Sequence, residues 1–326
     1  MLRIERSLDH PIITPDSHPT IGKNIQGPSL IKVPDWVSNR LGRYYLYFAD
    51  HKGAYIRLAY ADDLLGPWRI HPAGSLHLRD SLFPTDPPEP AGGTGAGFAD
   101  GGTLTAKRSH SRHIEASTPH IASPDVHVNH EDQCIVMYYH GLEEYAKQST
   151  RVALSRDGIN FAARPEILGR TYFRVFQHED FFYALAMPGQ FYRSRNRYSG
   201  FEPGPLLFNG DMRHSAIMVR DGKLYVFWTQ VGHAPESIML STIALASDWH
   251  RWQETEPSEI LHPEFDWEGA DAPPKPSIRS TAYGHVNQLR DPAIFVEDGS
   301  IYVLYAVAGE SGIAIASVIF DSQDHN

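Results

Sequence analysis

The sequence has almost no cysteine and no long hydrophobic run. Its 326 residues include one cysteine, which excludes an intramolecular disulfide framework and a cysteine-rich zinc site. No segment approaches the roughly 20 consecutive apolar residues of a membrane helix. The first residues, MLRIERSLDHPI, lack the apolar core of a secretory signal. We therefore expect a cytoplasmic protein with no membrane partner.

Positive charge is also scarce. The chain has 29 Lys and Arg residues against 39 Asp and Glu, a formal net charge of −10. Because nucleic acids are bound through a surplus of basic residues, we expect no nucleic-acid partner. Aromatic residues and histidine are plentiful instead, with 16 Tyr, 15 Phe, 6 Trp and 18 His. No pattern in the sequence predicts an oligomeric state.

Helical periodicity is nearly missing, and short β-branched and aromatic runs separated by turn signals take its place. These runs repeat as five copies of a three- or four-stranded meander. The second strand of each copy is expected at residues 44–50, 134–140, 181–187, 224–230 and 301–307. A repeat of this size predicts a β-propeller, since each blade buries its faces against its neighbours.

We therefore predict an all-β, five-bladed β-propeller that forms one domain over residues 1–326. Asp221-Gly222 and Asp298-Gly299 predict tight hairpins within two of the copies. The last copy lacks an outer strand, and we expect Leu2–Arg6 to supply it and close the ring. A β-sandwich with a similar number of strands is the alternative.

One stretch, at about residues 71–119, breaks the rhythm of the repeat. It is rich in proline and glycine and shows no strand pattern. Long loops inside compact domains are usually binding loops, lids or disordered segments. The sequence is therefore compatible with two interpretations of this stretch, a lid over the mouth of the propeller and a mobile insertion.

Three turn and strand motifs accompany the repeat. Residues 59–68, AYADDLLGPW, resemble an S-x-D-L-x-G-P-W turn, and residues 155–161, SRDGINF, resemble its S-x-D-G-x-x-F/W variant. Residues 291–295, DPAIF, resemble a D-P-x-I/V-F strand. On these motifs the chain resembles the superfamily of five-bladed glycosidases that contains arabinanases, xylosidases, fructan-cleaving invertases and neoagarobiose hydrolases.

The resemblance implies a specific set of catalytic carboxylates. Members carry an Asp on the inner strand of the first blade as base or nucleophile, another Asp on a later blade and a Glu as general acid. At the matching first-blade position this chain reads Gly27-Pro28-Ser29 where the family reads Asp-Pro-Ser. The implied set is incomplete, and fold analogy alone does not supply the reaction.

The meander predicts which side chains share one mouth of the propeller, because the start of each inner strand and the end of the second strand lie at the same end. Glycoside hydrolysis needs two carboxyl groups, one protonated and one ionised. In the hydrolase hypothesis, Asp125 or Asp291 is the ionised partner and Glu144 or Glu310 is the acid. The alternative for Asp291 is that it only caps the strand that it begins.

Imidazole and guanidinium groups are expected at the same mouth. In a lyase hypothesis His140 or His214 abstracts a proton next to a uronate carboxylate, and Arg174 or Arg290 neutralises that carboxylate. The residues expected to bind substrate are Gln26, His51, His120, Arg174, Arg213, His285 and Arg290.

The leading hypothesis is a glycoside hydrolase-like enzyme that acts on an oligosaccharide. The alternatives are a polysaccharide lyase acting on an anionic, uronate-containing sugar, and a sugar-binding propeller without catalysis. None of these functions requires a cofactor, and no H-x-H or H-E-x-x-H pair predicts a metal site. A divalent metal or calcium in the central channel remains a further alternative.

Overall fold

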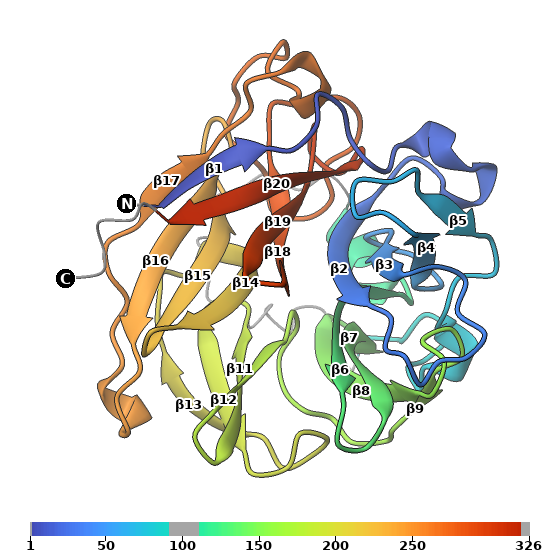
Figure 1. The fold of residues 1–326 in the computed structure, drawn as a ribbon, viewed down its shortest axis with the longest axis vertical. Coiled ribbons are helices and arrows are strands. Elements are labelled where there is room, and N and C mark those ends of the chain that lie inside the picture. Colours follow the sequence, from blue (N-terminus) through green and yellow to red (C-terminus); the bar gives the residue numbers. More distant parts are fainter. Residues whose placement is uncertain (1, 91–110, 321–326) are drawn as a thin grey trace.

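The structure is a computed structural model that describes residues 2–90 and 111–320. These residues form five four-stranded antiparallel sheets arranged in a ring around a central axis (Figure 1). Each sheet is one blade of the propeller. The predicted all-β, five-bladed propeller is thus confirmed, and the alternative of a β-sandwich is excluded.

Each blade is a simple meander. The first blade contains β2 (Gln26–Lys32), β3 (Tyr44–Ala49), β4 (Arg57–Ala61) and β5 (Arg69–His71). The second contains β6 (Ile121–Asn129), β7 (Cys134–Glu144), β8 (Lys147–Ser155) and β9 (Ala162–Ala163). The third contains β10 (Arg174–His178), β11 (Phe181–Ala186), β12 (Gln190–Ser194) and β13 (Glu202–Leu206). The fourth contains β14 (Met212–Arg220), β15 (Lys223–Gln230), β16 (Ile238–Ala244) and β17 (Ser258–Leu261). The fifth contains β18 (Arg290–Glu297), β19 (Ser300–Ala306), β20 (Ile313–Phe320) and β1 (Leu2–Arg6).

The N-terminal strand closes the ring, as predicted. β1 pairs with β20 in antiparallel register, from Leu2 opposite Phe320 to Arg6 opposite Ala316 (Figure 1, blue beside red). The Arg6 Nε donates to the buried Glu268 Oε1 at 2.8 Å. The ring is therefore fastened by both a strand ladder and a partly buried ion pair.

The predicted Asp-Gly hairpins are present. Asp221 and Gly222 have φ angles of 49° and 70°, and Asp298 and Gly299 have 50° and 80°. Two consecutive residues with positive φ match the right-handed twist of the flanking strands, which is why tight hairpins use this dipeptide.

The aromatic content is explained by packing between blades. The described residues form five hydrophobic clusters, and each contains side chains from two neighbouring blades. The cluster between the third and fourth blades, for example, stacks Tyr183, Trp249 and Trp252, with ring centroids of Tyr183 and Trp252 4.9 Å apart. Broad flat sheets that face each other need large side chains to fill the wedge between them.

The insertion expected at about 71–119 contains some regular structure. It begins at the end of β5, and it includes η3 (Leu78–Asp80) and α1 (Arg112–Ser117). Residues 91–110, on which the hypothesis of a lid would rest, lie outside the described residues. The remaining short helices are η1 (Pro15–Ser17), η2 (Pro19–Ile21), η4 (Trp249–Arg251) and η5 (Asp266–Glu268). Within the described ranges, no helix has the length and apolar character needed to cross a membrane.

Candidate active site

One position at the start of the inner strand has the same unusual backbone in all five blades. The residues at this position have a left-handed φ between 45° and 67°, and they are Gly27, Ser123, Tyr172, His214 and Asp291. In four of the blades the position coincides with a shift of strand register. A β-bulge of this kind changes the direction of a side chain, and bulges are enriched beside active sites.

Three of these five side chains meet at the axis. The Tyr172 hydroxyl donates to Asp291 Oδ1, and the Tyr172 ring stacks on the His214 ring with centroids 5.2 Å apart. The His214 Nδ1 lies 3.8 Å from Asp291 Oδ2. Residues from the third, fourth and fifth blades thus form one cluster, which we call the mouth cluster.

Asp291 is the acidic member of the mouth cluster, and it is only 1% exposed. Its Oδ2 has no hydrogen-bond partner among the described residues. Burial, and then the charge of Glu310, raise the pKa of Asp291 well above its ordinary range. Asp291 therefore keeps its proton to higher pH than an ordinary aspartate, which makes it a candidate proton donor.

Glu310 is the second carboxyl at this mouth, and its surroundings are polar. It accepts hydrogen bonds from Arg290 Nη1 at 2.7 Å, Asn24 Nδ2 at 2.6 Å and the Ala282 amide at 3.2 Å. His51 Nδ1 lies 3.6 Å from it. Burial alone would raise the pKa of Glu310, but His51 and Arg290 lower it to about 2. The pKa values of Asp291 and Glu310 are therefore shifted in opposite directions within one site.

Glu310 is the first of four buried side chains whose charges alternate in sign, followed by Arg290, Glu236 and Arg213. Arg290 Nε lies 3.2 Å from Glu236 Oε2, and Arg213 donates to both oxygens of Glu236 at 2.9 and 2.5 Å. Burial opposes the charge on Glu236, but Arg213 and Arg290 lower its pKa below the ordinary range. Because an unpaired buried charge is strongly unfavourable, the alternating signs fix all four side chains in place.

Neutral imidazoles line the same mouth. The His140 ring centroid lies 5.9 Å from that of Tyr172 and 6.1 Å from that of His120. Burial, helped by the charge of His51, lowers the pKa of His140 to about 3. Burial also lowers the pKa values of His120 and His214 well below their ordinary range. The His140 Nδ1 is buried and has no partner among the described residues, so it faces the site with an unused lone pair or proton.

Arg174 lies across the channel beside the mouth cluster. Its Nε donates to the Ser215 carbonyl at 2.8 Å and its Nη1 to the Pro124 carbonyl at 3.1 Å, so it connects the fourth and second blades. Its Cζ lies 4.6 Å from the centroid of the Tyr172 ring. Arg174 thus borders the mouth cluster on the side of the Tyr172 ring.

The structure brings together most of the side chains expected at this mouth. They are Asp291, Glu310, His140, His214, His51, His120, Arg174, Arg213 and Arg290, joined by the contacts given above. Gln26 is buried next to Gly27, where its Oε1 accepts from the Ser123 hydroxyl at 3.4 Å. The end of the insertion also reaches the mouth, because Glu115 of α1 lies 3.3 Å from Lys52 Nζ.

Three expected residues lie elsewhere. Glu144 is exposed in the turn between β7 and β8 and pairs with Lys147 at 2.8 Å, because these two strands continue beyond the mouth. His285 is exposed and pairs with Asp271. Asp125 lies further down the channel, next to His127.

The position of Asp125 has a simple cause. The residue that matches Asp291 in the second blade is Ser123, since both hold the left-handed φ of the bulge. Asp125 comes two residues later. It matches Ser29 in the first blade and Ala293 in the fifth, because regular strand pairing resumes at each of these residues after the register shift. Asp125 and Asp291 therefore do not occupy matching positions in their blades, because Asp125 lies two residues further along its inner strand.

The same comparison locates the missing first-blade aspartate. Gly27 holds in the first blade the position that Asp291 holds in the fifth. A Cβ on Gly27 would lie 3.0 Å from the Ser123 Cα, a distance tighter than ordinary packing. The first blade therefore contributes no carboxylate here, and its backbone lies close to that of the second blade.

Two residues of the site were not identified as central from the sequence. Glu236 lies between β15 and β16, in a loop without a strand or turn motif that would indicate a buried charge. Tyr172 holds the bulge position, but in its blade no proline follows, unlike Gly27-Pro28 and Asp291-Pro292. The motif that marks this position in other blades is therefore absent. In the described part of the chain no three His, Cys, Asp or Glu side chains are placed together to hold a metal ion.

Comparison with solved structures agrees on the fold. A family-43 β-xylosidase/α-arabinofuranosidase from a compost microbial metagenome superimposes with a TM-score of 0.57 at 10% identity, over 98% of this chain and 96% of that one. An endo-1,4-β-xylanase from Bacteroides thetaiotaomicron gives a TM-score of 0.57 at 13% identity, over 93% of both chains. At such identities the likeness shows the five-bladed fold of these hydrolases.

Sequence comparison gives one relative of much higher identity. No protein-family model matches the chain. The uncharacterized protein R118 of Acanthamoeba polyphaga mimivirus is 35% identical over 318 residues, which span 89% of this chain and 82% of the relative. The protein therefore belongs to the same family as the mimivirus protein R118, and it has the five-bladed propeller fold of the family-43 glycoside hydrolases.

Proposed function

We propose that the protein is a glycoside hydrolase that acts on an oligosaccharide at the mouth cluster. The observation that carries this proposal is the pair of buried carboxyls at one mouth, whose different surroundings raise the pKa of Asp291 and lower that of Glu310. Glycosidic bonds are cleaved by such a pair, since one group must give a proton while negative charge stabilises the developing cation. The fold shared with family-43 hydrolases supports the same proposal.

Asp291 is the proton donor in this proposal. Its proton goes to the glycosidic oxygen, and the bond between that oxygen and the anomeric carbon breaks. Water adds to the anomeric carbon, and a water proton restores the acid form of Asp291. The Tyr172 hydroxyl holds the Oδ1 of Asp291, which leaves Oδ2 to face the substrate.

Glu310 acts through its charge. It already accepts three hydrogen bonds and its side chain is fully buried, so a covalent bond to the sugar would require breaking this network. An ionised carboxylate held in a fixed position stabilises an oxocarbenium-like transition state without reorganisation. The unused Nδ1 of His140 is the group that would hold the attacking water.

A polysaccharide lyase is the second candidate, and one observation favours it. Tyr172 and the neutral His140 lie beside the buried guanidinium of Arg174. A lyase needs a base next to a uronate Cα–H and a cation that neutralises the uronate carboxylate. Both groups are present within the mouth.

The products separate these functions. We expect the protein, incubated with a panel of plant and microbial oligosaccharides, to release reducing sugar without any ultraviolet-absorbing unsaturated product. Formation of an unsaturated product from a uronate-containing substrate would replace the hydrolase with the lyase. Saturable binding of a sugar without either product would identify a non-catalytic sugar-binding propeller.

A further inference from the structure

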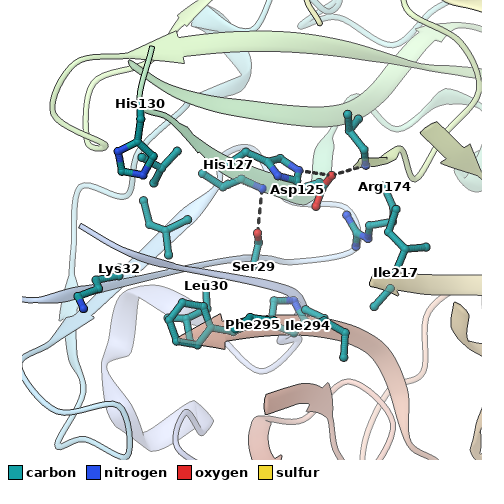
Figure 2. Close-up of a pocket in the computed structure, with 18 residues that line it drawn as sticks. Ser29, Leu30, Lys32, Asp125, His127, His130, Arg174, Ile217, Ile294 and Phe295 are labelled. Carbon is teal, nitrogen blue, oxygen red and sulfur yellow. Dashed lines mark hydrogen bonds and ion pairs between the residues drawn. The ribbon is translucent and has the colours of Figure 1, made fainter. Parts of the chain in front are cut away.

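A cavity of about 330 Å³ lies in the central channel, further along the five inner strands than the mouth cluster (Figure 2). Strands β2, β6, β10, β14 and β18 all contribute to its lining. Every residue of that lining follows the left-handed position of its own blade. Its volume is at the lower end of the range of small-molecule sites, about 300–1,000 Å³.

The carboxylate of Asp125 faces this cavity (Figure 2). Its Oδ2 accepts from the Val175 amide at 2.8 Å and lies 2.8 Å from His127 Nε2. Burial would raise the pKa of Asp125, but His127 and Arg174 lower it below its ordinary range. Asp125 is therefore a fixed, ionised hydrogen-bond acceptor whose position is set by two neighbouring blades.

Arg174 supplies a matching donor. It lines the same cavity and is only 3% exposed. Its Nε and Nη1 donate to backbone carbonyls, whereas its Nη2 is buried without a partner among the described residues. A buried guanidinium N–H without an acceptor is unfavourable, so a ligand or water that accepts from it gains that hydrogen bond.

The charges in the cavity balance. Asp125 and Arg174 carry opposite charges, and Lys32 at the rim pairs with Glu297 at 2.6 Å. The remaining lining combines the polar side chains of Ser29, His127 and His130 with apolar ones, which include Leu30, Ile217 and Phe295 (Figure 2). Neither a strongly anionic nor a strongly cationic ligand is favoured by such a lining. A neutral molecule with hydroxyl groups on an otherwise apolar ring fits it better.

We propose that this cavity is a second binding site, distinct from the mouth cluster, for a neutral hydroxyl-bearing ring of monosaccharide size. One hydroxyl donates to Asp125, another accepts from Arg174 Nη2, and the C–H face of the ring packs on the apolar wall. Arg174 and the Tyr172 ring separate the two sites. The proposal does not depend on catalysis at the mouth.

Two variants test the cavity directly. Asp125→Asn removes the charged acceptor but keeps an oxygen for the Val175 amide. Ile217→Phe fills the cavity from its apolar side and leaves the polar groups unchanged. Val219→Phe is the matched control, because Val219 is on the same strand, is exposed and is outside the cavity lining. D-xylose, D-galactose and myo-inositol serve as probes, with inorganic phosphate as an anionic comparison.

The readout is the amide NMR spectrum of the full chain, with Val126 and Val175 as reporters because their amides donate to Ser29 and Asp125. We expect at least one neutral probe to shift both signals, with a dissociation constant of the order of 1 mM. Asp125→Asn and Ile217→Phe should each weaken this binding about tenfold or more, while Val219→Phe and the mouth variant Asp291→Asn leave it unchanged. Absence of shifts with every neutral probe, shifts with phosphate alone, or binding lost only in Asp291→Asn would overturn the proposal.

Discussion

Asp291 and Glu310 carry the same functional group but differ in the hydrogen bonds that they accept. Glu310 accepts from Asn24, Arg290 and a backbone amide, whereas within the described residues Asp291 accepts only from the Tyr172 hydroxyl. Donors that point at a carboxylate favour its ionised form, and burial without such donors favours the acid. At the scale of single residues, this contrast supports the proposed roles of Asp291 as the proton donor and Glu310 as the ionised carboxylate.

The coupling between these carboxyls gives a prediction about pH. Because the negative charge of Glu310 helps to raise the pKa of Asp291, Glu310→Gln should lower that pKa. The titration of the Asp291 carboxyl, followed by NMR of ¹³C-labelled aspartate, should then move to lower pH. In the proposed hydrolase, the alkaline limb of activity should lie where Asp291 loses its proton. An unchanged titration in a folded Glu310→Gln variant would show that the two groups do not interact.

Linkage gives the sign of the effect of Glu310 on stability. Its pKa in the folded protein, about 2, is below its ordinary value of 4.5. The ionised form therefore stabilises the fold above about pH 4.5, and this contribution is lost as the pH falls toward 2. The opposite holds for Asp291, whose raised pKa makes the fold lose stability as the pH rises through it.

At the scale of strands, β1 is the element on which closure of the ring depends. Without it, β20 would present an open edge, and Glu268 would lose its cation. Tyr305 also donates to Glu268 at 3.0 Å, so the carboxylate is anchored in the core of the last blade. The first residues of the chain are thus structural parts of its last blade.

Arg6→Ala should therefore destabilise the fold, because it leaves the buried Glu268 charge without its cation. We expect a loss of roughly 2 kcal/mol in the free energy of unfolding, since Arg6 itself is partly exposed. Urea unfolding measures it, with Arg3→Ala on the exposed face of the same strand as a control that should change stability by less than about 0.5 kcal/mol. Equal effects of the two substitutions would show that the ion pair does not contribute to closure.

The strands were predictable from the sequence because their signal is local. Short β-branched and aromatic runs mark each meander, and Asp-Gly turns mark two of them. The N-terminal outer strand of the last blade follows from counting these runs. The position of each side chain along the channel is harder to predict, because it depends on where the left-handed residue of the bulge falls in each inner strand. The proline that follows this residue marks it in three blades, as Gly27-Pro28, Ser123-Pro124 and Asp291-Pro292, but no proline marks it in the third and fourth blades. Glu236 and Tyr172 reach the site through contacts between blades, which local patterns do not contain.

At the scale of the whole molecule, the ring is one packing unit with a channel that has two different ends. Each hydrophobic cluster joins two neighbouring blades, so every blade depends on both of its neighbours. Arg174 connects the second and fourth blades across the axis and divides the channel into the mouth and the cavity. The acid–base pair lies at one end, and the electroneutral cavity lies at the other.

In the proposed reaction, Asp291 gives a proton to the glycosidic oxygen. This step is tested most directly by the rate of reducing-sugar release from the best oligosaccharide substrate, compared between Asp291→Asn and the surface control Glu144→Gln. We predict that Asp291→Asn lowers kcat by about 10²–10⁴-fold with little change in substrate binding, and that Glu144→Gln has the rate of the unmodified protein. Unchanged turnover in a folded Asp291→Asn variant would contradict the assignment.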